Sequence, residues 1–340
     1  SGSERLTVNA KVAYQDRQSE GNGFDEGGPP WTQPRGVPEP NREEWSLVNL
    51  DISSRFGWGR LFSATWWVDR TTSHDADATR LYLGPASSTT VTTVSEGKQQ
   101  DFVQEFRLQS TGEGSLDWLL GLFYKDQDYR LDHEVVLDAE TPNRLLVGQT
   151  DRPTKETAAF GDIIWRFDER WETTLGGRWF KFKHSANSSV IGPLAGPGRF
   201  QQTEASETGF TPKLGLSFLP NDEVIFYGTV AGGYRPGGTN ETVFEEFPDC
   251  REQLGWLGLT GIPQTYESDS LWSYELGIKS GWAARRIYLN AAVFHIDWSD
   301  MQTPAGLFCG ANWMQNAGEA TSKGAELELV AYPGRNLELT

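Results

Sequence analysis

The chain has 340 residues, of which 37% are hydrophobic and 12% aromatic, and it carries a formal net charge of −17. Its 14 Trp argue against a disordered chain, because disordered segments are poor in aromatic residues. The modest apolar content argues against a compact α/β enzyme, whose buried strands are rich in Ile, Leu and Val. The acidic charge excludes a nucleic-acid partner, and no run approaches the roughly 20 apolar residues that a membrane helix needs.

Along the chain, extended segments are joined in pairs by very short turns. These turns contain Gly, Asp, Asn and Pro, the residues that tight turns require, and each pair therefore predicts a β-hairpin. The six predicted hairpins join residues 43–56 to 59–71, 98–111 to 115–131, 155–167 to 170–184, 207–219 to 223–235, 269–280 to 284–298, and 319–331 to the segment from 336 onward.

Long polar connections separate the hairpins. They are rich in Gly, Pro, Ser, Thr and Asp, as loops are, and loops of this length are uncommon in a compact soluble domain. Alternation of short turns with long loops is typical of outer-membrane barrels, which have short periplasmic turns and long extracellular loops. The predicted loops span 18–42, 72–97, 132–152, 187–203, 236–268 and 300–317.

Within most segments, apolar and polar residues alternate, as they do on a strand with one apolar face. In 271–279 the apolar face holds Trp272, Tyr274, Leu276 and Ile278, and in 59–69 the alternation assigns it Phe62, Ala64, Trp66 and Val68, with Trp67 as an exception. The segment 284–298 is ambiguous because both of its faces carry apolar residues.

Strand length and aromatic placement favour a membrane barrel over a soluble β-sandwich or propeller. Many segments exceed ten residues, which is enough to cross a bilayer at a tilt. Aromatic side chains gather beside the hairpin turns, where a membrane–water interface favours them; they are Trp58, Trp118, Trp165, Trp171, Phe218 and Trp282. The predicted fold is an all-β, transmembrane, antiparallel up-and-down β-barrel.

About thirteen strand segments are visible, and the last one stops in mid-strand at Thr340. Bacterial outer-membrane barrels have an even number of strands, and lipid does not tolerate an unpaired sheet edge. We therefore expect the barrel in residues 1–340 to be partial.

Several short motifs follow one another in a definite order: Phe102–Leu108, Asp117–Tyr124, Pro212–Ser217, Gly233–Asn240, Ser273–Lys279, Leu289–Phe294, Ile296–Gln302, Asn316–Gly318 and Lys323–Glu328. In order and spacing, they resemble the barrel of TonB-dependent outer-membrane receptors from about residue 98 to the end. The first hundred residues fit that family by the rhythm of strands and loops alone.

The resemblance implies a 22-stranded barrel whose lumen is closed by a plug domain. It also implies a bacterial outer-membrane location in contact with lipid, and import of a scarce nutrient, most often an iron–siderophore complex. The TonB complex supplies the energy through a short box ahead of the plug. No plug, TonB box or closing strands with a terminal aromatic residue are recognisable, so the resemblance covers a partial barrel domain at 1–340.

Other functions remain open at this point. A passive porin shares the architecture, and TonB-dependent receptors for cobalamin, saccharides or other metal chelates share the family. An outer-membrane enzyme is disfavoured because no catalytic set of residues stands out. We predict no enzymatic activity, no cofactor and no metal site, since the four histidines have no ligand spacing.

Cys250 and Cys309 fall in two successive long loops on the same predicted face. The cell exterior permits disulfides, so we predict a Cys250–Cys309 bridge that pins two extracellular loops. Two free thiols are the alternative.

Ligand contacts in this family come from the loops and the upper lumen wall. The candidates, which supply charge and stacking surface, are Arg235, Asn240, Trp256, Tyr266 and Trp313. A second set is predicted to face the lumen and hold the plug through ion pairs: Glu105, Arg107, Asp162, Arg166 and Arg178. For any single loop residue, the alternative is that it simply packs or solvates the loop.

Overall fold

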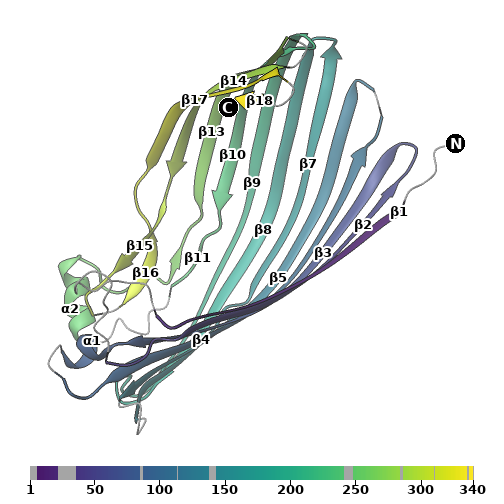
Figure 1. Ribbon diagram of the computed structural model, residues 1–340. Coiled ribbons are helices and arrows are strands. Elements are labelled where there is room, and N and C mark those ends of the chain that lie inside the picture. Colours follow the sequence, from purple (N-terminus) through teal and green to yellow (C-terminus); the bar gives the residue numbers. More distant parts are fainter. Residues whose placement is uncertain are drawn as a thin grey trace.

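The computed structural model describes residues 6–21, 36–84, 87–112, 114–137, 143–240, 248–283, 286–309, 311–334 and 337–339. These residues form one 14-stranded antiparallel sheet and two small two-stranded sheets. Figure 1 shows the large sheet as a tall, curved wall. The prediction of an all-β, antiparallel fold is confirmed.

Long strands make up the wall: β1 (Leu6–Ser19), β2 (Asn41–Arg55), β3 (Gly59–Asp77), β4 (Val91–Ser110), β5 (Leu116–Leu137), β6 (Asn143–Asp151), β7 (Thr154–Asp168), β8 (Trp171–Ile191), β9 (Arg199–Asn221), β10 (Val224–Arg235), β13 (Asp269–Trp282), β14 (Ile287–Ser299), β17 (Ala320–Gly334) and β18 (Leu337–Leu339). Smaller elements lie between them: α1 (Thr79–Leu83), β11 (Gly238–Thr239), α2 (Pro248–Trp256), β12 (Thr265–Tyr266), β15 (Gln302–Gly306) and β16 (Asn312–Asn316). Neither described helix has the length and apolar character to cross a membrane.

Each wall strand pairs with the next one along the chain, as an up-and-down barrel requires. The one variation is that β6 and β7 both pair with β5 and β8, so that they lie end to end between the same neighbours. Pro153 separates them, and proline has no N–H to donate to a sheet ladder. With β6 and β7 taken together, the described wall has thirteen strand positions, as the sequence indicated.

The two ends of the wall differ as predicted. Tight turns join β2 to β3 at 56–58, β7 to β8 at 169–170, and β9 to β10 at 222–223. The last residue of the predicted turn at 333–335, residue 335, lies outside the described residues. Figure 1 places α1, α2 and the β15–β16 hairpin together at the opposite end from these turns.

Wall strands run through much of three predicted loops, which were therefore wrong. Half of 72–97 and most of 132–152 and 187–203 belongs to wall strands, because β3, β4, β5, β8 and β9 continue far beyond the predicted ends and β6 lies in the middle connection. The first of these stretches is rich in Thr and Ser, and all three contain Val; both Thr and Val favour extended backbone. Polar composition alone therefore does not distinguish a strand in water from a loop. Of the predicted loop 18–42, residues 22–35 lie outside the described residues.

The register assigns the two faces of the wall, because residues directly opposite each other in a ladder share a face. One face carries a continuous set of exposed apolar side chains, which include Ile52, Phe106, Leu122, Trp179 and Phe210. We call it the lipid face, since a membrane barrel turns its apolar face outward. The opposite face is the lumen face.

The predicted apolar face of β3 was wrong. Trp67 lies on the lipid face, opposite Val48 and Phe102. Phe62 and Ala64 lie instead on the lumen face, opposite Arg107 and Glu105. The two adjacent Trp residues of β3 obscure its alternation, and only the neighbouring strands settle it.

The described residues have two small hydrophobic clusters rather than one large core. One contains Ala78, Val91, Val135, Leu146, Val190 and Ala195. The other joins α2 to β15–β16 and contains Cys250, Leu254, Ile262, Ala311 and Trp313. The second cluster belongs to the candidate site.

Candidate functional site

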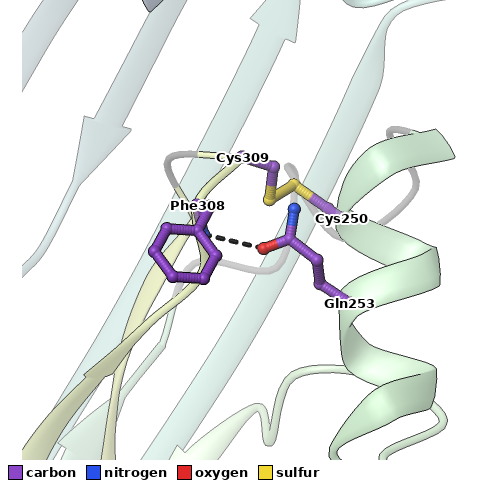
Figure 2. Close-up of a disulfide and its surroundings, with 4 residues drawn as sticks. All are labelled: Cys250, Gln253, Phe308 and Cys309. Carbon is purple, nitrogen blue, oxygen red and sulfur yellow. Dashed lines mark hydrogen bonds between the residues drawn. A yellow bond between two sulfur atoms is a disulfide. The ribbon is translucent and has the colours of Figure 1, made fainter.

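Two extracellular connections form one folded unit, which we call the loop module: α2, β11–β12 and β15–β16. Cys250 of α2 is joined by a disulfide to Cys309, which follows β15, and their Cα atoms lie 5.4 Å apart. Beside the bridge, the backbone N–H of Phe308 donates to Oε1 of Gln253 at 2.7 Å, as Figure 2 shows. The two connections are therefore linked both covalently and by a hydrogen bond.

A small hydrophobic core lies beneath the bridge. Trp313 is only 4% exposed and packs in the cluster with Leu254 and Ile262. Its Nε1 has no hydrogen-bond partner among the described residues. Trp313 thus stabilises the loop module from within, and the structure does not place it on a surface that a ligand reaches directly.

Asn240 connects the two halves of the loop module. Its Nδ2 donates to the carbonyl oxygens of Pro263 and Met314 at 2.9 and 2.7 Å, and its Oδ1 accepts from the backbone N–H of Met314 at 2.8 Å. Both polar atoms of this 5% exposed side chain are therefore occupied by backbone groups. This arrangement agrees with the alternative reading, in which the residue packs the loop.

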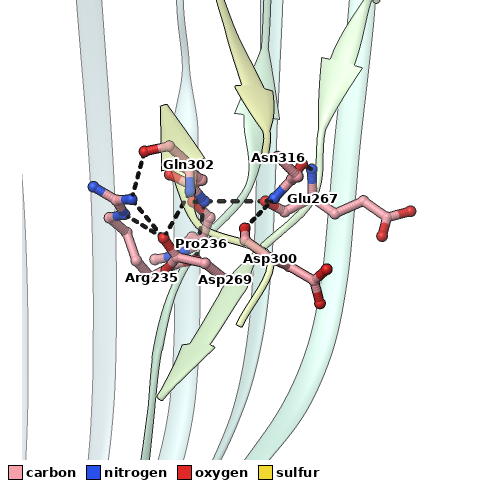
Figure 3. A network of polar contacts seen from close by, with 7 residues as sticks. All are labelled: Arg235, Pro236, Glu267, Asp269, Asp300, Gln302 and Asn316. Carbon is pink, nitrogen blue, oxygen red and sulfur yellow. Dashed lines mark hydrogen bonds and ion pairs between the residues drawn. The ribbon is translucent and has the colours of Figure 1, made fainter. Parts of the chain in front are cut away.

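Arg235 and Asp269 form an ion pair where β10 and β13 enter the loop module. Nη2 of Arg235 lies 2.5 Å from Oδ2 of Asp269, whose side chain is only 2% exposed. The same carboxylate oxygen accepts from the backbone N–H of Gln302, and Gln302 Nε2 donates to the carbonyls of Arg235, Pro236 and Glu267. Figure 3 shows this network, which fixes β15 to the loop end of the wall.

The guanidinium of Arg235 is therefore already engaged. It also donates to the carbonyl oxygen of Gln302 at 3.0 Å and lies over the ring of Trp298, 5.4 Å from its centroid. About half of the side chain, 47%, stays exposed. An anionic ligand at this point would meet a cation whose charge Asp269 already balances.

Two predicted loop residues keep accessible surface. Trp256 ends α2 and is 70% exposed. Leu257, the next residue, and Phe308, on the other connection, are also strongly exposed. Tyr266 is half-buried and faces Gly238 across the β11–β12 pair. Burial raises the pKa of the Tyr266 hydroxyl, which therefore remains a neutral hydrogen-bond donor at physiological pH.

The five predicted lumen residues all lie on the lumen face. Arg107, Gly121, Phe160 and Arg178 stand in one row across four strands, and Glu105 and Asp162 stand in the rows on either side. Most of their charges are paired within the wall: Glu105 with Arg107, Arg178 with Glu156 at 2.7 Å, and Arg166 with Asp117 at 2.6 Å and Glu172 at 3.1 Å. Asp162 alone of the five has no hydrogen bond or ion pair to another described residue.

The sequence did not single out the aromatic surface around Arg178. Its guanidinium lies over the rings of Phe123 and Phe160, 4.9 and 5.7 Å from their centroids. Next to it, the rings of Phe180 and Tyr234 stack with centroids 3.5 Å apart. These residues come from four strands, so the cluster becomes visible only when the register is known.

The described residues contain no group of His, Cys, Asp and Glu that could hold a metal ion. His184 and His133 hydrogen-bond to the hydroxyls of Thr154 and Ser95, and His295 pairs with Asp297. Each of these three imidazoles has a local partner on the wall.

Known proteins resemble this chain in sequence and in architecture. The family model "TonB dependent receptor-like, beta-barrel" matches residues 3–339. The pesticin receptor of Yersinia enterocolitica is 27% identical over 229 residues, which cover 66% of this chain and 30% of that receptor. The metal-pseudopaline receptor CntO of Pseudomonas aeruginosa is 26% identical over 198 residues, which cover 56% of this chain and 24% of that receptor.

Solved structures show the same fold. The ferric yersiniabactin uptake receptor FyuA of Yersinia pestis aligns with a TM-score of 0.72 at 19% identity, covering 98% of this chain and 48% of FyuA. The ferric citrate transporter FecA aligns with a TM-score of 0.61 at 14% identity, covering 96% of this chain and 45% of FecA. The chain thus spans about a third of its curated relatives and about half of these solved structures.

The match over nearly the whole chain agrees with the oriented wall, the apolar lipid face and the loops gathered at one end. The chain belongs to the β-barrel family of the TonB-dependent receptors, which are bacterial outer-membrane proteins and not enzymes.

Proposed function

We propose that the protein to which this barrel belongs imports a metal chelate across the outer membrane with energy from the TonB complex, and that the chelate is an iron–siderophore complex. The observation that carries the proposal is the family match over residues 3–339, together with relatives that are named as receptors for metal complexes. The loop module supports it, because a folded extracellular unit above the lumen is suited to holding a ligand.

A plug domain is part of the proposal. A 22-stranded barrel, as the family implies, leaves a wide lumen that a separate domain closes. Most lumen charges are already paired within the wall, so Asp162 is the member of the predicted set that is best placed to accept a hydrogen bond from the plug. Near Asp162, the guanidinium N–H groups of Arg107 and Arg178 that are not used in these ion pairs can donate to the plug.

Ligand contact is proposed for the accessible loop residues. Trp256 supplies an exposed ring, and Tyr266 a neutral hydroxyl. Arg235, Asn240 and Trp313 act indirectly, since each is held within the loop module or its base. We expect their substitution to disturb ligand binding through the shape of the loop module.

Uptake of ⁵⁵Fe bound to individual siderophores tests the proposal. A strain deleted for the full-length gene should lose uptake of one chelate, and a plasmid copy should restore it. A protonophore should abolish that uptake, because TonB draws on the inner-membrane gradient. Uptake that persists with the protonophore would indicate a passive porin, and normal iron uptake with loss of cobalamin or saccharide uptake would change the substrate class.

A further inference from the structure

A groove of about 580 Å³ opens on the lipid face of β2–β5, far from the loop module and the lumen. Its floor is one register row, in which Val48, Trp67, Phe102 and Asp126 stand side by side on four strands. The rings of Trp67 and Phe102 lie 5.5 Å apart, and Phe102 also contacts Tyr124. Towards the tight turns, the lipid face continues with the apolar Ile52, Phe106 and Leu122.

The groove therefore lies at the extracellular edge of the apolar band. On β5 the lipid-face residues change from Leu122 through Tyr124 to Asp126 and Asp128 within six positions. Such a change marks the passage from acyl chains to headgroups. A molecule in the groove would have its apolar part among the lipid chains and its polar end at the membrane surface.

The outer rim of the groove is acidic. The next register row holds Ser46, Asp69, Gln100 and Asp128. Asp69 accepts a hydrogen bond from Gln100 Nε2 at 2.8 Å but has no ion-pair partner among the described residues. Asp128 forms no hydrogen bond or ion pair there, and its charge is felt only at longer range by Lys155, whose ammonium is paired with Asp126. Two carboxylates outside any ion pair of the described residues thus face the same opening.

The third carboxylate provides an internal comparison. Asp126 is balanced by Lys155, whose Nζ lies 3.1 Å from its Oδ2, and it accepts a hydrogen bond from the Tyr124 hydroxyl at 2.9 Å. An interfacial aromatic girdle accounts for Trp67 and Phe102. It does not account for a hollow bordered by Asp69 and Asp128, which together select a positive group.

We infer that this groove binds a membrane lipid whose headgroup carries an ammonium group. The carboxylates of Asp69 and Asp128 accept charge-assisted hydrogen bonds from the ammonium, and the face of Trp67 attracts the same cation. The acyl chains lie along Val48 and the apolar band below it. A headgroup with only negative charge is repelled by the same rim.

Native mass spectrometry of the full-length protein tests this inference with two lipids of identical acyl chains, phosphatidylethanolamine and phosphatidylglycerol. We expect the ethanolamine lipid to be retained preferentially, and the double variant Asp69→Asn/Asp128→Asn to reduce the preference by about threefold, as the loss of two exposed charge pairs implies. The control Asp16→Asn/Asp132→Asn removes the same charge from the lipid face outside the groove and should leave the preference intact.

Equal retention of both lipids by the unsubstituted protein would overturn the inference. So would an unchanged preference in the Asp69→Asn/Asp128→Asn variant, since the selective groups would then lie elsewhere. Because both aspartates are exposed, the variant should fold, and heat-dependent migration of the barrel in gels checks that it does. Siderophore uptake should be the same in all variants, which separates this inference from the proposed transport function.

Discussion

The wall and the loop module are stabilised in opposite ways. The wall relies on long antiparallel ladders between strands of up to 23 residues, while its large apolar side chains stay exposed for lipid to cover. The loop module has short strands of two to five residues, and it relies instead on a disulfide, a small core and buried hydrogen bonds. Since the two regions depend on different interactions, they should be separable by mutation.

Removal of the disulfide is expected to produce the largest difference in stability between the loop module and the wall. The bridge spans 59 residues, and a cross-link of that span contributes about 4 kcal/mol in the chain-entropy model. Cys250→Ser/Cys309→Ser should therefore make local opening of the loop module easier by about that amount and leave the wall unchanged. Hydrogen exchange of residues 248–259 and 302–316, compared with β8 and β9, measures both effects.

Dithiothreitol applied to the unsubstituted protein is the matched control, because it breaks the same bond without changing a residue. Reduced protein and double variant should show the same exchange. Equal loss of protection in β8 and β9 would mean that the loop module and the wall form one cooperative unit.

A charge on the lipid face should destabilise the wall alone. Leu214 of β9 is 50% exposed on the apolar band, and Arg at the middle of the bilayer costs about 2–4 kcal/mol. Leu214→Arg should lower the free energy of unfolding in lipid vesicles by that order, measured by urea titration. Ser217→Arg, on the lumen face of the same strand, should have little effect, and equal effects of the two would contradict the assignment of the faces.

The sequence predicted the wall better than the loop module for a physical reason. Alternation and turn residues are local signals, so the hairpins at 56–59, 168–169 and 220–222 were predicted within one or two residues. Extension of β3 and β8 into polar stretches was missed, because pairing with a neighbouring strand rather than composition keeps those residues extended.

The roles of the loop residues depend on contacts between distant segments. Trp313 and Asn240 look like ligand-binding residues in the sequence. In the structure, however, segments up to 74 residues away bury the ring of Trp313 and engage the polar atoms of the Asn240 side chain. Cys250 and Cys309 could be paired in advance, because two cysteines in loops on the same side have few alternatives. No comparable local signal indicates that Arg235 is neutralised by Asp269.

The ion pair at the junction of the two regions should have a smaller effect than the disulfide. Asp269→Asn keeps the size of the side chain but removes the charge that balances Arg235, and loss of charge-assisted hydrogen bonds costs about 2 kcal/mol. We expect faster exchange at Gln302 and in β15, with little change in β10. Asp297→Asn, which removes an exposed carboxylate from β14, is the control and should leave β15 protected.

The smallest expected effect concerns how the lumen face packs without a core. Gly121 lies directly opposite Phe160, and a Cβ at position 121 would lie 2.1 Å from the Phe160 ring. Gly121→Ala should therefore displace the ring and destabilise the wall by about 1–2 kcal/mol, the usual cost of overpacking. Gly57→Ala, at a turn where a Cβ would meet nothing within 4 Å, should be neutral.

A second substitution identifies the cause. If the ring is responsible, Phe160→Leu in the Gly121→Ala background should recover part of the lost stability, because the smaller side chain leaves room for the new methyl group. Failure of that rescue, measured by the same urea titration, would assign the cost to the strand backbone instead. Rescue would show that the lumen face is stabilised by rings lying over glycines, as Phe180 lies over Gly209, and not by a core like that of the loop module.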